Sequence, residues 1–388
     1  MRKIIILSLI ILLIGASAIE VNAAQARGND NDPLMVKFLR VGLKKASGKT
    51  LRLTINGEFK LKDRIISDKS EMVISIQKDK LYYDRQIFDV IELKPQDSNS
   101  NIIINYGKVS HSFTGSFEIR PSKGKVLPIN IVPIEEYVEG VLPYEMASSY
   151  PLEALKAQAV TARNYAISSI TKHRNEKFDV CDTIHCQVYK GKIKHSDKIE
   201  NAVKQTRGEI LTYNNQIVKA FFYSSNGGYI ESSKNIWNSN HTYLRARKDE
   251  FDTFEWEKSK KLRPNEIESI LKKKGYITKN DNFEKIGKIS TNDSGRNSEI
   301  EVLCRDYKGK EKVVTLDGEE PRIAFSLKSS MYSIEYNQNE NVYVFDGRGY
   351  GHGVGMSQLG AKKRAEEGHS YKDILGFYYP DTKLCKGN

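Results

Sequence analysis

The chain has 388 residues and a formal charge of +12, from 61 Lys and Arg against 49 Asp and Glu. With 39% apolar residues, 27 Gly and 10 Pro, it is not a collagen, a coiled-coil rod or a polytopic membrane protein. Its 10% aromatic residues can anchor a core, its length predicts two or three domains, and its four Cys exclude a disulfide-stapled mini-protein.

Residues 1–26 are predicted to direct export. Arg2 and Lys3 precede an apolar run from Ile4 to Ile19, and Val21-Asn22-Ala23 offers a cleavage site. The run is a little long for a signal peptide core and a little short for a membrane span, so either a cleaved signal peptide or an N-terminal membrane anchor fits. The remaining chain is then extracytoplasmic. There its positive charge favours anionic partners such as a cell wall, and we expect no nucleic acid partner.

Residues 34–125 are predicted to form a β-rich accessory region. Val36–Val41 alternates in polarity, and Asn56-Gly57 between Leu51–Ile55 and Glu58–Leu61 predicts a hairpin. Further strands are expected at Met72–Ile76, Ile87–Leu93 and Ile102–Tyr106. We find no cluster of catalytic residue types in this region.

Residues 126–388 combine helix and strand patterns, so the predicted fold class is α+β. An alanine-rich helix over residues 152–169 is expected to be central and buried, because small side chains permit close packing. The other predicted elements are a strand at 127–134, a short helix at 135–141, helices at 197–206, 356–367 and 371–379, and a hairpin of 209–213 with 216–223.

Two cysteines and a histidine lie within Cys181–Cys186, with His185 between the thiols. Thiolate and imidazole are ligands that suit Zn²⁺, and His173 upstream can complete a set of four. Four protein ligands would make the metal structural, whereas three would leave a position open for catalysis. The alternatives are a chance cluster of these residue types or, in an exported protein, a Cys181–Cys186 disulfide.

Two further segments are candidates for substrate binding. Alternating glycines in Gly347–Gly355 permit another backbone or a ligand to approach, and they place Arg348, Tyr350 and His352 on one side of an extended chain. The alternative is a buried strand packed against a helix. The second segment carries Tyr223, Ser224 and Ser225, whose hydroxyl groups suit sugar or peptide recognition.

Glu145 is expected in a loop, Pro143–Met146, directly before the alanine-rich helix, where it is a candidate acid. A nucleotide enzyme and a serine hydrolase are poor interpretations, because the chain has no phosphate-binding loop and no nucleophile elbow.

Taken together, these segments resemble the SpoIID/LytB family of stage II sporulation proteins. The residues that carry the resemblance are Val132–Met146, Pro151–Ala166, Tyr223–Gly228, Trp237, Tyr243-Leu244 and Gly349–Ala361, with a looser match at Leu39–Leu43. The resemblance spans roughly residues 127–388 and implies a SpoIID-type catalytic region.

The resemblance implies a lytic transglycosylase that acts on peptidoglycan glycan strands during forespore engulfment. It places Glu145 as the catalytic acid, and we expect Arg163 to orient the substrate or the acid. It also implies a SpoIIP-like amidase or endopeptidase and a SpoIIM-like membrane protein as partners, and a zinc ion with a structural role. Two rivals are a wall-binding enhancer of an amidase without catalytic activity, and a zinc-dependent wall hydrolase.

Overall fold

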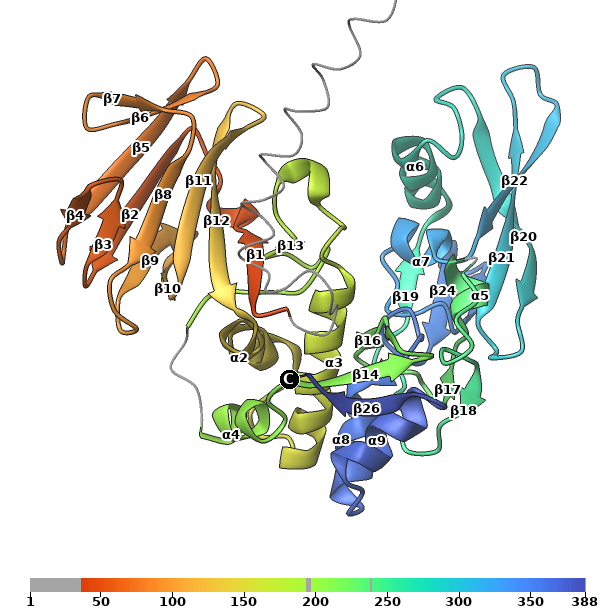
Figure 1. Cartoon of the computed structure of the whole chain (residues 1–388). Coiled ribbons are helices and arrows are strands. Elements are labelled where there is room, and N and C mark those ends of the chain that lie inside the picture. The colour runs from red at the N-terminus through yellow and green to blue at the C-terminus, as the bar shows by residue number, and fades with distance from the viewer. Residues whose placement is uncertain (1–35, 193–196, 238, 388) are drawn as a thin grey trace, which may run out of the picture. The chain divides into compact units, whose positions relative to one another are not determined.

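The computed structural model describes residues 36–192, 197–237 and 239–387, which divide into two compact units (Figure 1). Unit 1 comprises the chain up to Lys219 together with Lys383–Asn388, and unit 2 comprises Ala220–Thr382. Helices and strands are mixed, which confirms the predicted α+β class. The expected export segment, residues 1–26, lies outside the described residues. Within the described part of the chain, no helix has both the length and the apolar character that a membrane crossing requires.

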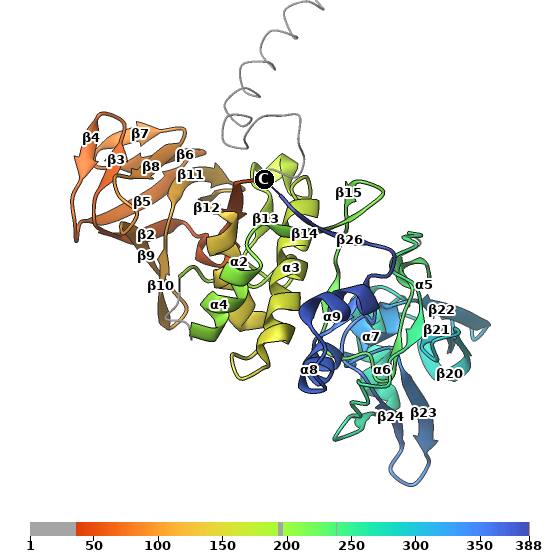
Figure 2. The ribbon, with the colours of Figure 1, turned by 60° about the horizontal axis from the view of Figure 1, so that its bottom comes forward.

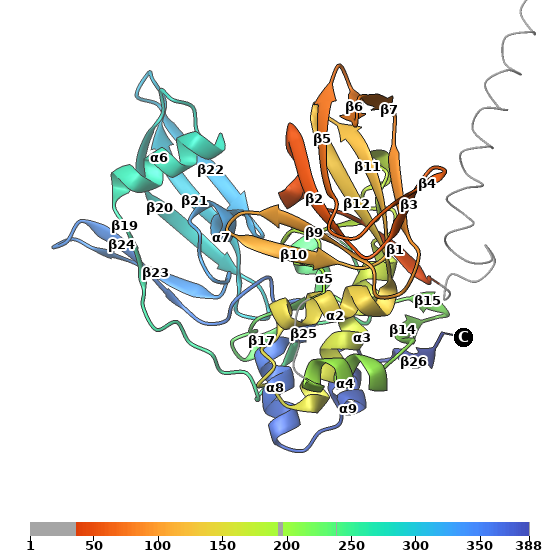
Figure 3. The ribbon, with the colours of Figure 1, turned by 90° about the vertical axis from the view of Figure 1, so that its left-hand side faces the viewer.

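The β-rich half of unit 1 consists of two sheets (Figure 3). The seven-stranded sheet has the order β13-β1-β12-β11-β8-β3-β4, and the six-stranded sheet has the order β10-β9-β2-β5-β6-β7. The strands are β1 (Phe38–Gly42), β2 (Thr50–Asn56), β3 (Phe59–Leu61), β4 (Arg64–Ile66), β5 (Glu71–Gln77), β6 (Lys80–Tyr83), β7 (Gln86–Phe88), β8 (Ile91–Pro95), β9 (Asn101–Tyr106), β10 (Val109–Phe113), β11 (Ser116–Ser122), β12 (Lys125–Pro133) and β13 (Val180–Cys181).

The two sheets pack against each other through β12, which contacts both β2 and β5. Burial alternates along β2, where Leu51, Leu53 and Ile55 face the core, as expected for strands with one solvated face. The border expected between residues 125 and 126 falls inside β12, whereas the chain passes from unit 1 to unit 2 between Lys219 and Ala220.

The hairpin predicted at Asn56-Gly57 is wrong. β2 pairs with β5 and β9, whereas β3 pairs with β4 and β8, so the turn connects strands of different sheets. Gly57 does have a positive φ of 88°, which glycine adopts without steric cost. The prediction of a turn at Asn56-Gly57 is therefore confirmed, but a turn does not determine which strands pair. Similarly, residues 87–93 form two strands, β7 and β8, in different sheets.

The described part of unit 1 also contains the α-helices α2 (Ile134–Glu145), α3 (Leu152–Ser168) and α4 (Asp197–Gln205) (Figure 2). The alanine-rich helix α3 packs against α2, α4 and β14 (Glu209–Tyr213). The alanines that let these neighbours approach its backbone are all fully buried: Ala154, Ala157, Ala159, Ala162 and Ala166.

A small sheet of the order β15-β14-β26 closes unit 1. β15 (Gln216–Ile217) pairs with β14, which confirms the predicted hairpin as far as Ile217. The remainder of the predicted second strand belongs to unit 2, where Phe222–Tyr223 forms β16. The third strand, β26 (Lys383–Lys386), comes from the far end of the described chain.

Unit 2 is built around a three-stranded meander with its own hydrophobic core. The meander consists of β20 (Asn282–Thr291), β21 (Asn297–Arg305) and β22 (Glu311–Asp317), and it packs against α6 (Pro264–Lys274) and α7 (Glu320–Ala324). The other elements are β17 (Tyr229–Ile230), α5 (Ser233–Trp237), β18 (Arg247–Lys248), β19 (Lys260–Leu262), β23 (Tyr332–Asn337), β24 (Val342–Gly347), β25 (Met356–Ser357), α8 (Gln358–Glu366) and α9 (Tyr371–Tyr378). The last two helices lie where the sequence predicts them.

Candidate active site and metal-binding cluster

Four metal-ligating side chains gather in unit 1: His173, Cys181, His185 and Cys186, whose donor atoms all lie within 4.8 Å of one another. The Cys186 Sγ lies 3.4 Å from His173 Nε2 and 3.6 Å from His185 Nδ1, and the Cys181 Sγ lies 3.7 Å from His185 Nδ1. A tetrahedral zinc ion with its usual bond lengths separates sulfur and nitrogen ligands by roughly 3.5 Å. The four predicted ligands therefore have the spacing of a zinc site.

The fold positions this cluster where two segments of unit 1 meet. Cys181 ends β13, which pairs with β1 in parallel register, Gly42 opposite Cys181. The next residue, Asp182, fixes this end of the strand, because its carboxylate accepts the Lys44 N–H at 2.9 Å. Cys186 N–H then donates to the Thr183 carbonyl at 3.0 Å, a turn that returns the second thiol toward the first.

A carboxylate outside the cluster orients one of its histidines. Glu176 Oε2 lies 2.5 Å from His173 Nδ1, so the other ring nitrogen of His173 faces Cys186. Metal-binding histidines usually have such a partner. Lys44 Nζ in turn lies 3.1 Å from Glu176 Oε2. Glu176 was not among the predicted site residues, although its position three residues after His173 could have indicated a partner for that ring.

The two thiols are free and interact with each other. The hydrogen bond from Cys186, supported by Thr183, lowers the pKa of Cys181 well below the ordinary thiol range. The same hydrogen bond, together with burial, raises the pKa of Cys186. The pair can therefore hold one negative charge between its two sulfur atoms.

Glu145 is the last residue of α2, so its predicted placement in a loop is wrong. Pro143 suggested a break, but the helix continues for two more residues and ends when Met146 N–H donates to the Leu142 carbonyl at 2.9 Å. Pro143 has no N–H to donate to the Glu139 carbonyl, yet the helix continues through it. The Glu145 side chain is half-buried, between the partly exposed Tyr144 and the buried Met146.

Tyr137 interacts both with Glu145 and with residues at the cluster of histidines and cysteines. Its buried hydroxyl group donates to Gln187 Oε1 at 3.1 Å, next to Cys186 in the chain. Burial first, and then several neighbours that include Cys186 and Glu145, raise the pKa of Tyr137 well above the ordinary phenol value. The predicted acid and the cluster thus act electrostatically on the same buried tyrosine.

Arg163, expected to contact substrate, is only 1% exposed. Its Nε and Nη2 donate to the two carboxylate oxygens of Glu135 at 3.0 and 2.6 Å, and Nη1 donates to the Glu209 carbonyl at 3.0 Å. Arg163 therefore ties α3 to α2 and β14. These three hydrogen bonds within the protein argue against the predicted contact of Arg163 with a substrate.

The remaining predicted binding residues lie together in unit 2. β16 pairs in parallel with β25, and Ser225 and Tyr350 form two backbone hydrogen bonds of 3.0 and 2.8 Å. The structure therefore brings the serine segment and the glycine-rich segment side by side. Their side chains differ in access, because Tyr350 is 50% exposed and Ser224 is half-buried, whereas Tyr223 and Ser225 are buried.

The buried Ser225 and the half-buried His352 both have hydrogen-bond partners within unit 2. Ser225 Oγ donates to Asp252 Oδ1 at 2.6 Å. His352 accepts the Val354 N–H at Nδ1, 3.1 Å away, and its ring also hydrogen-bonds the Phe222 backbone. Burial, with Arg322 and Arg296 nearby, lowers the pKa of His352 to about 3, so the ring is neutral. These contacts favour a packing role for Ser225. Tyr350 is exposed and Ser224 and His352 are half-buried, so these three are the accessible candidates.

The glycine-rich segment needs its glycines because neighbours approach its backbone. A Cβ added at Gly355, where φ is 86°, would lie 2.1 Å from the Phe221 carbonyl oxygen. At Gly353, where φ is 83°, it would lie 2.5 Å from the Arg296 guanidinium carbon. The predicted close approach of another backbone is thus confirmed at Gly355.

Comparison with known proteins identifies the class of this fold and site. A family model described as Stage II sporulation protein matches residues 122–213, which contain Glu145, α3 and the four donors of the cluster. A second model, described as a domain of unknown function, matches residues 233–355 in unit 2. The chain belongs to the SpoIID family, as the following relatives also show.

Stage II sporulation protein D of Bacillus subtilis (strain 168) is 34% identical over 275 residues, which cover 66% of this chain and 76% of that protein. An uncharacterized protein of Brachyspira hyodysenteriae is 34% identical over 280 residues, 71% of this chain and 73% of the relative. The amidase enhancer of B. subtilis is 35% identical over 288 residues, but these cover only 40% of its length.

Proposed function

We propose that this protein is an extracytoplasmic lytic transglycosylase that cleaves the MurNAc–GlcNAc bonds of peptidoglycan, in forespore engulfment, with Glu145 as its acid and base. The observation that carries the proposal is the position of Glu145. It is half-buried at the end of α2, inside the region that the SpoIID model matches. The N-terminal segment would act as a membrane anchor or as a cleaved signal peptide.

The chemistry requires one carboxyl group. Glu145 first protonates the leaving glycosidic oxygen, and its carboxylate then accepts the proton of the MurNAc 6-hydroxyl group. That oxygen attacks C1 and closes a 1,6-anhydro ring, so water and the second carboxylate of ordinary glycosidases are not needed. The carbonyl end of a helix carries a partial negative charge. The end of α2 therefore suits a group that must start the reaction neutral.

The products of the purified protein test this proposal. Mass spectrometry of digested peptidoglycan should show 1,6-anhydroMurNAc ends. Reducing MurNAc ends would instead indicate a hydrolase. If the protein cleaves nothing but accelerates a SpoIIP-like amidase, the second candidate function, a wall-binding enhancer, is correct. The amidase enhancer among the relatives supports that candidate. Co-purification with the amidase and a SpoIIM-like membrane protein would test the proposed partners.

We further propose that His173, Cys181, His185 and Cys186 hold a structural Zn²⁺ ion. Four protein donors at the spacings described above fill a tetrahedral shell and leave no position for a substrate or a water molecule. The ion would then stabilise the fold around α3 and β13. A zinc-dependent hydrolase predicts that chelation abolishes cleavage without loss of fold, whereas a structural ion predicts that both decline together.

Cys181→Ser should lower zinc content and thermal stability together. Metal binding adds to the stability of the folded state only, and losing several kcal/mol of it should lower the Tm by about 5–10 °C. Atomic absorption and calorimetry measure the two quantities. The matched control is Cys385→Ser, which removes a partly buried thiol of β26 outside the cluster. The proposal would be contradicted if the wild-type protein contains no zinc and melts at the same temperature as the Cys181→Ser variant.

A further inference from the structure

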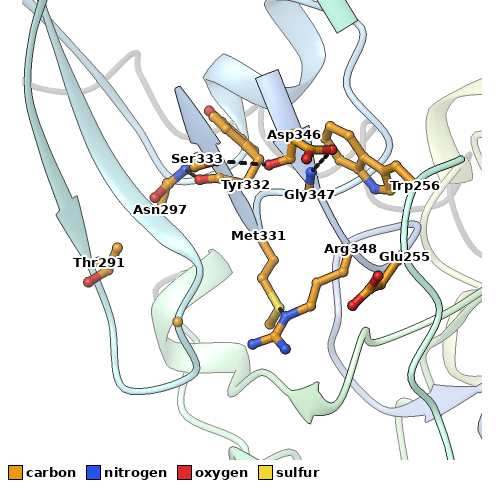
Figure 4. Close-up of a pocket in the computed structure, with 11 residues that line it drawn as sticks. Glu255, Trp256, Thr291, Asn297, Met331, Tyr332, Ser333, Asp346, Gly347 and Arg348 are labelled. Atoms are coloured by element: carbon orange, nitrogen blue, oxygen red, sulfur yellow. Dashed lines mark hydrogen bonds between the residues drawn. The ribbon is translucent and has the colours of Figure 1, made fainter. Parts of the chain in front are cut away.

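Unit 2 contains a pocket of about 390 Å³ that is separate from the residues discussed above as ligands or as the acid (Figure 4). The pocket lies where β20 and β24 finish and where β21 and β23 begin. Trp256 and Tyr332, each 8% exposed, form one wall with their rings stacked at a centroid separation of 6.3 Å.

Hydrogen bonds from side chains to backbone carbonyls fix these walls before any ligand binds. Trp256 Nε1 donates to the Gly349 carbonyl at 2.8 Å, and Asn297 Nδ2 donates to the Tyr332 carbonyl at 2.7 Å. Met331 adds an apolar thioether beside the aromatic wall. The lining of the pocket exposes more polar than apolar surface, and its walls are already formed without a ligand.

The charged side chains of the pocket, Glu255, Asp346 and Arg348, are all exposed, and among the residues that the structure describes they form no ion pair with one another. Glu255 and Arg348 face each other across an isolated antiparallel bridge, and Figure 4 shows both side chains at the pocket. Within the described part of unit 2, Arg348 forms no ion pair, and its Nε instead faces Met331 Sδ at 2.8 Å. Asp346 accepts one hydrogen bond at Oδ1, from the Gly347 N–H at 3.1 Å.

We propose that this pocket binds a short peptide that carries both a free carboxylate and a free ammonium group. The guanidinium of Arg348 matches a carboxylate in a two-pronged hydrogen bond, and the carboxylates of Glu255 and Asp346 accept hydrogen bonds from an ammonium group. The aromatic and thioether wall accommodates the aliphatic parts. A neutral sugar would leave these exposed charges to the solvent, whereas a peptide with both charges can pair with them. Resting on the proposed function, the ligand is the stem peptide of peptidoglycan.

Calorimetric titration of the full-length protein with a free stem tetrapeptide, L-alanyl-γ-D-glutamyl-diaminopimelyl-D-alanine, tests the pocket. Arg348→Gln should weaken binding ~10-fold or more, because it removes charged hydrogen bonds to a carboxylate. The matched control is Arg52→Gln on β2, which makes the same charge change at an exposed position of unit 1 and should bind like the wild type. Glu255→Gln should weaken binding of the native peptide but not of a peptide with both amino groups acetylated.

Three results would overturn the assignment: no binding by the wild type at millimolar peptide, equal binding by Arg348→Gln and the wild type, or displacement of the peptide by tri-N-acetylchitotriose, which would indicate a glycan subsite. A thermal melt of Arg348→Gln verifies that it is folded. The titration requires no cleavage, so its failure leaves the role of Glu145 standing. Conversely, if the wild-type protein binds the peptide but releases no anhydro ends, only the proposed function is wrong.

Discussion

Glu145→Gln should abolish the release of 1,6-anhydroMurNAc ends while peptidoglycan binding remains. The amide preserves the size and the hydrogen-bonding capacity of the side chain but cannot donate a proton and then recover one. General acid–base catalysis commonly contributes about 10²–10⁴ in rate, and here one group would serve both half-steps. Single-turnover assays on glycan strands, together with a pull-down on purified wall, measure the two quantities.

Glu139→Gln is the informative control for this experiment. Glu139 lies on the same helix and is also half-buried, and burial together with the charge of Glu200 raises its pKa. It is thus a carboxyl group of α2 with a raised pKa, and its variant should cleave like the wild type. Activity that survives Glu145→Gln but disappears in Glu139→Gln would transfer the acid role to Glu139.

Arg163→Met should destabilise unit 1 by about 3–5 kcal/mol, because it leaves the buried Glu135 carboxylate without its cation. Glu135 is 8% exposed, and its other described partner is the Gly208 N–H at 3.2 Å. The double variant Arg163→Met, Glu135→Leu removes both charges and should recover much of the loss, since replacing a whole buried ion pair with apolar groups is often near neutral.

Urea unfolding of the single and double variants measures this effect, with cleavage assayed in parallel under native conditions. If Arg163→Met is as stable as the wild type yet inactive, the original expectation of a substrate contact is right and the packing role is wrong. If activity returns with stability in the double variant, Arg163 acts only through the fold.

The local parts of the site were predictable, because the residues concerned are close in the chain. His173 to Cys186 span fourteen residues, so ligand type and spacing were enough to propose one cluster. The alanine pattern similarly predicts α3 to within a residue of its observed end. Neither inference required knowledge of distant contacts.

Burial and partners were not predictable in the same way. Arg163 has its partners 28 and 46 residues away, at Glu135 and Glu209, and Ser225 finds Asp252 27 residues further on. No local pattern distinguishes such a residue from one that contacts a ligand. The residues that line the pocket of unit 2 are even more scattered in the sequence. Trp256, Asn297, Met331 and Arg348 come from four separate segments.

The three-stranded sheet that closes unit 1 has a consequence for how this protein is made. β14 receives β15 from the adjacent turn, but its other neighbour, β26, is encoded after the whole of unit 2. During synthesis the edge of β14 therefore stays without its partner while more than a hundred residues are added, and unpaired edges invite association with other strands. An emerging chain therefore exposes that edge until Lys383–Lys386 has been synthesised. Clipping after Thr382 would return the mature protein to the same incomplete state.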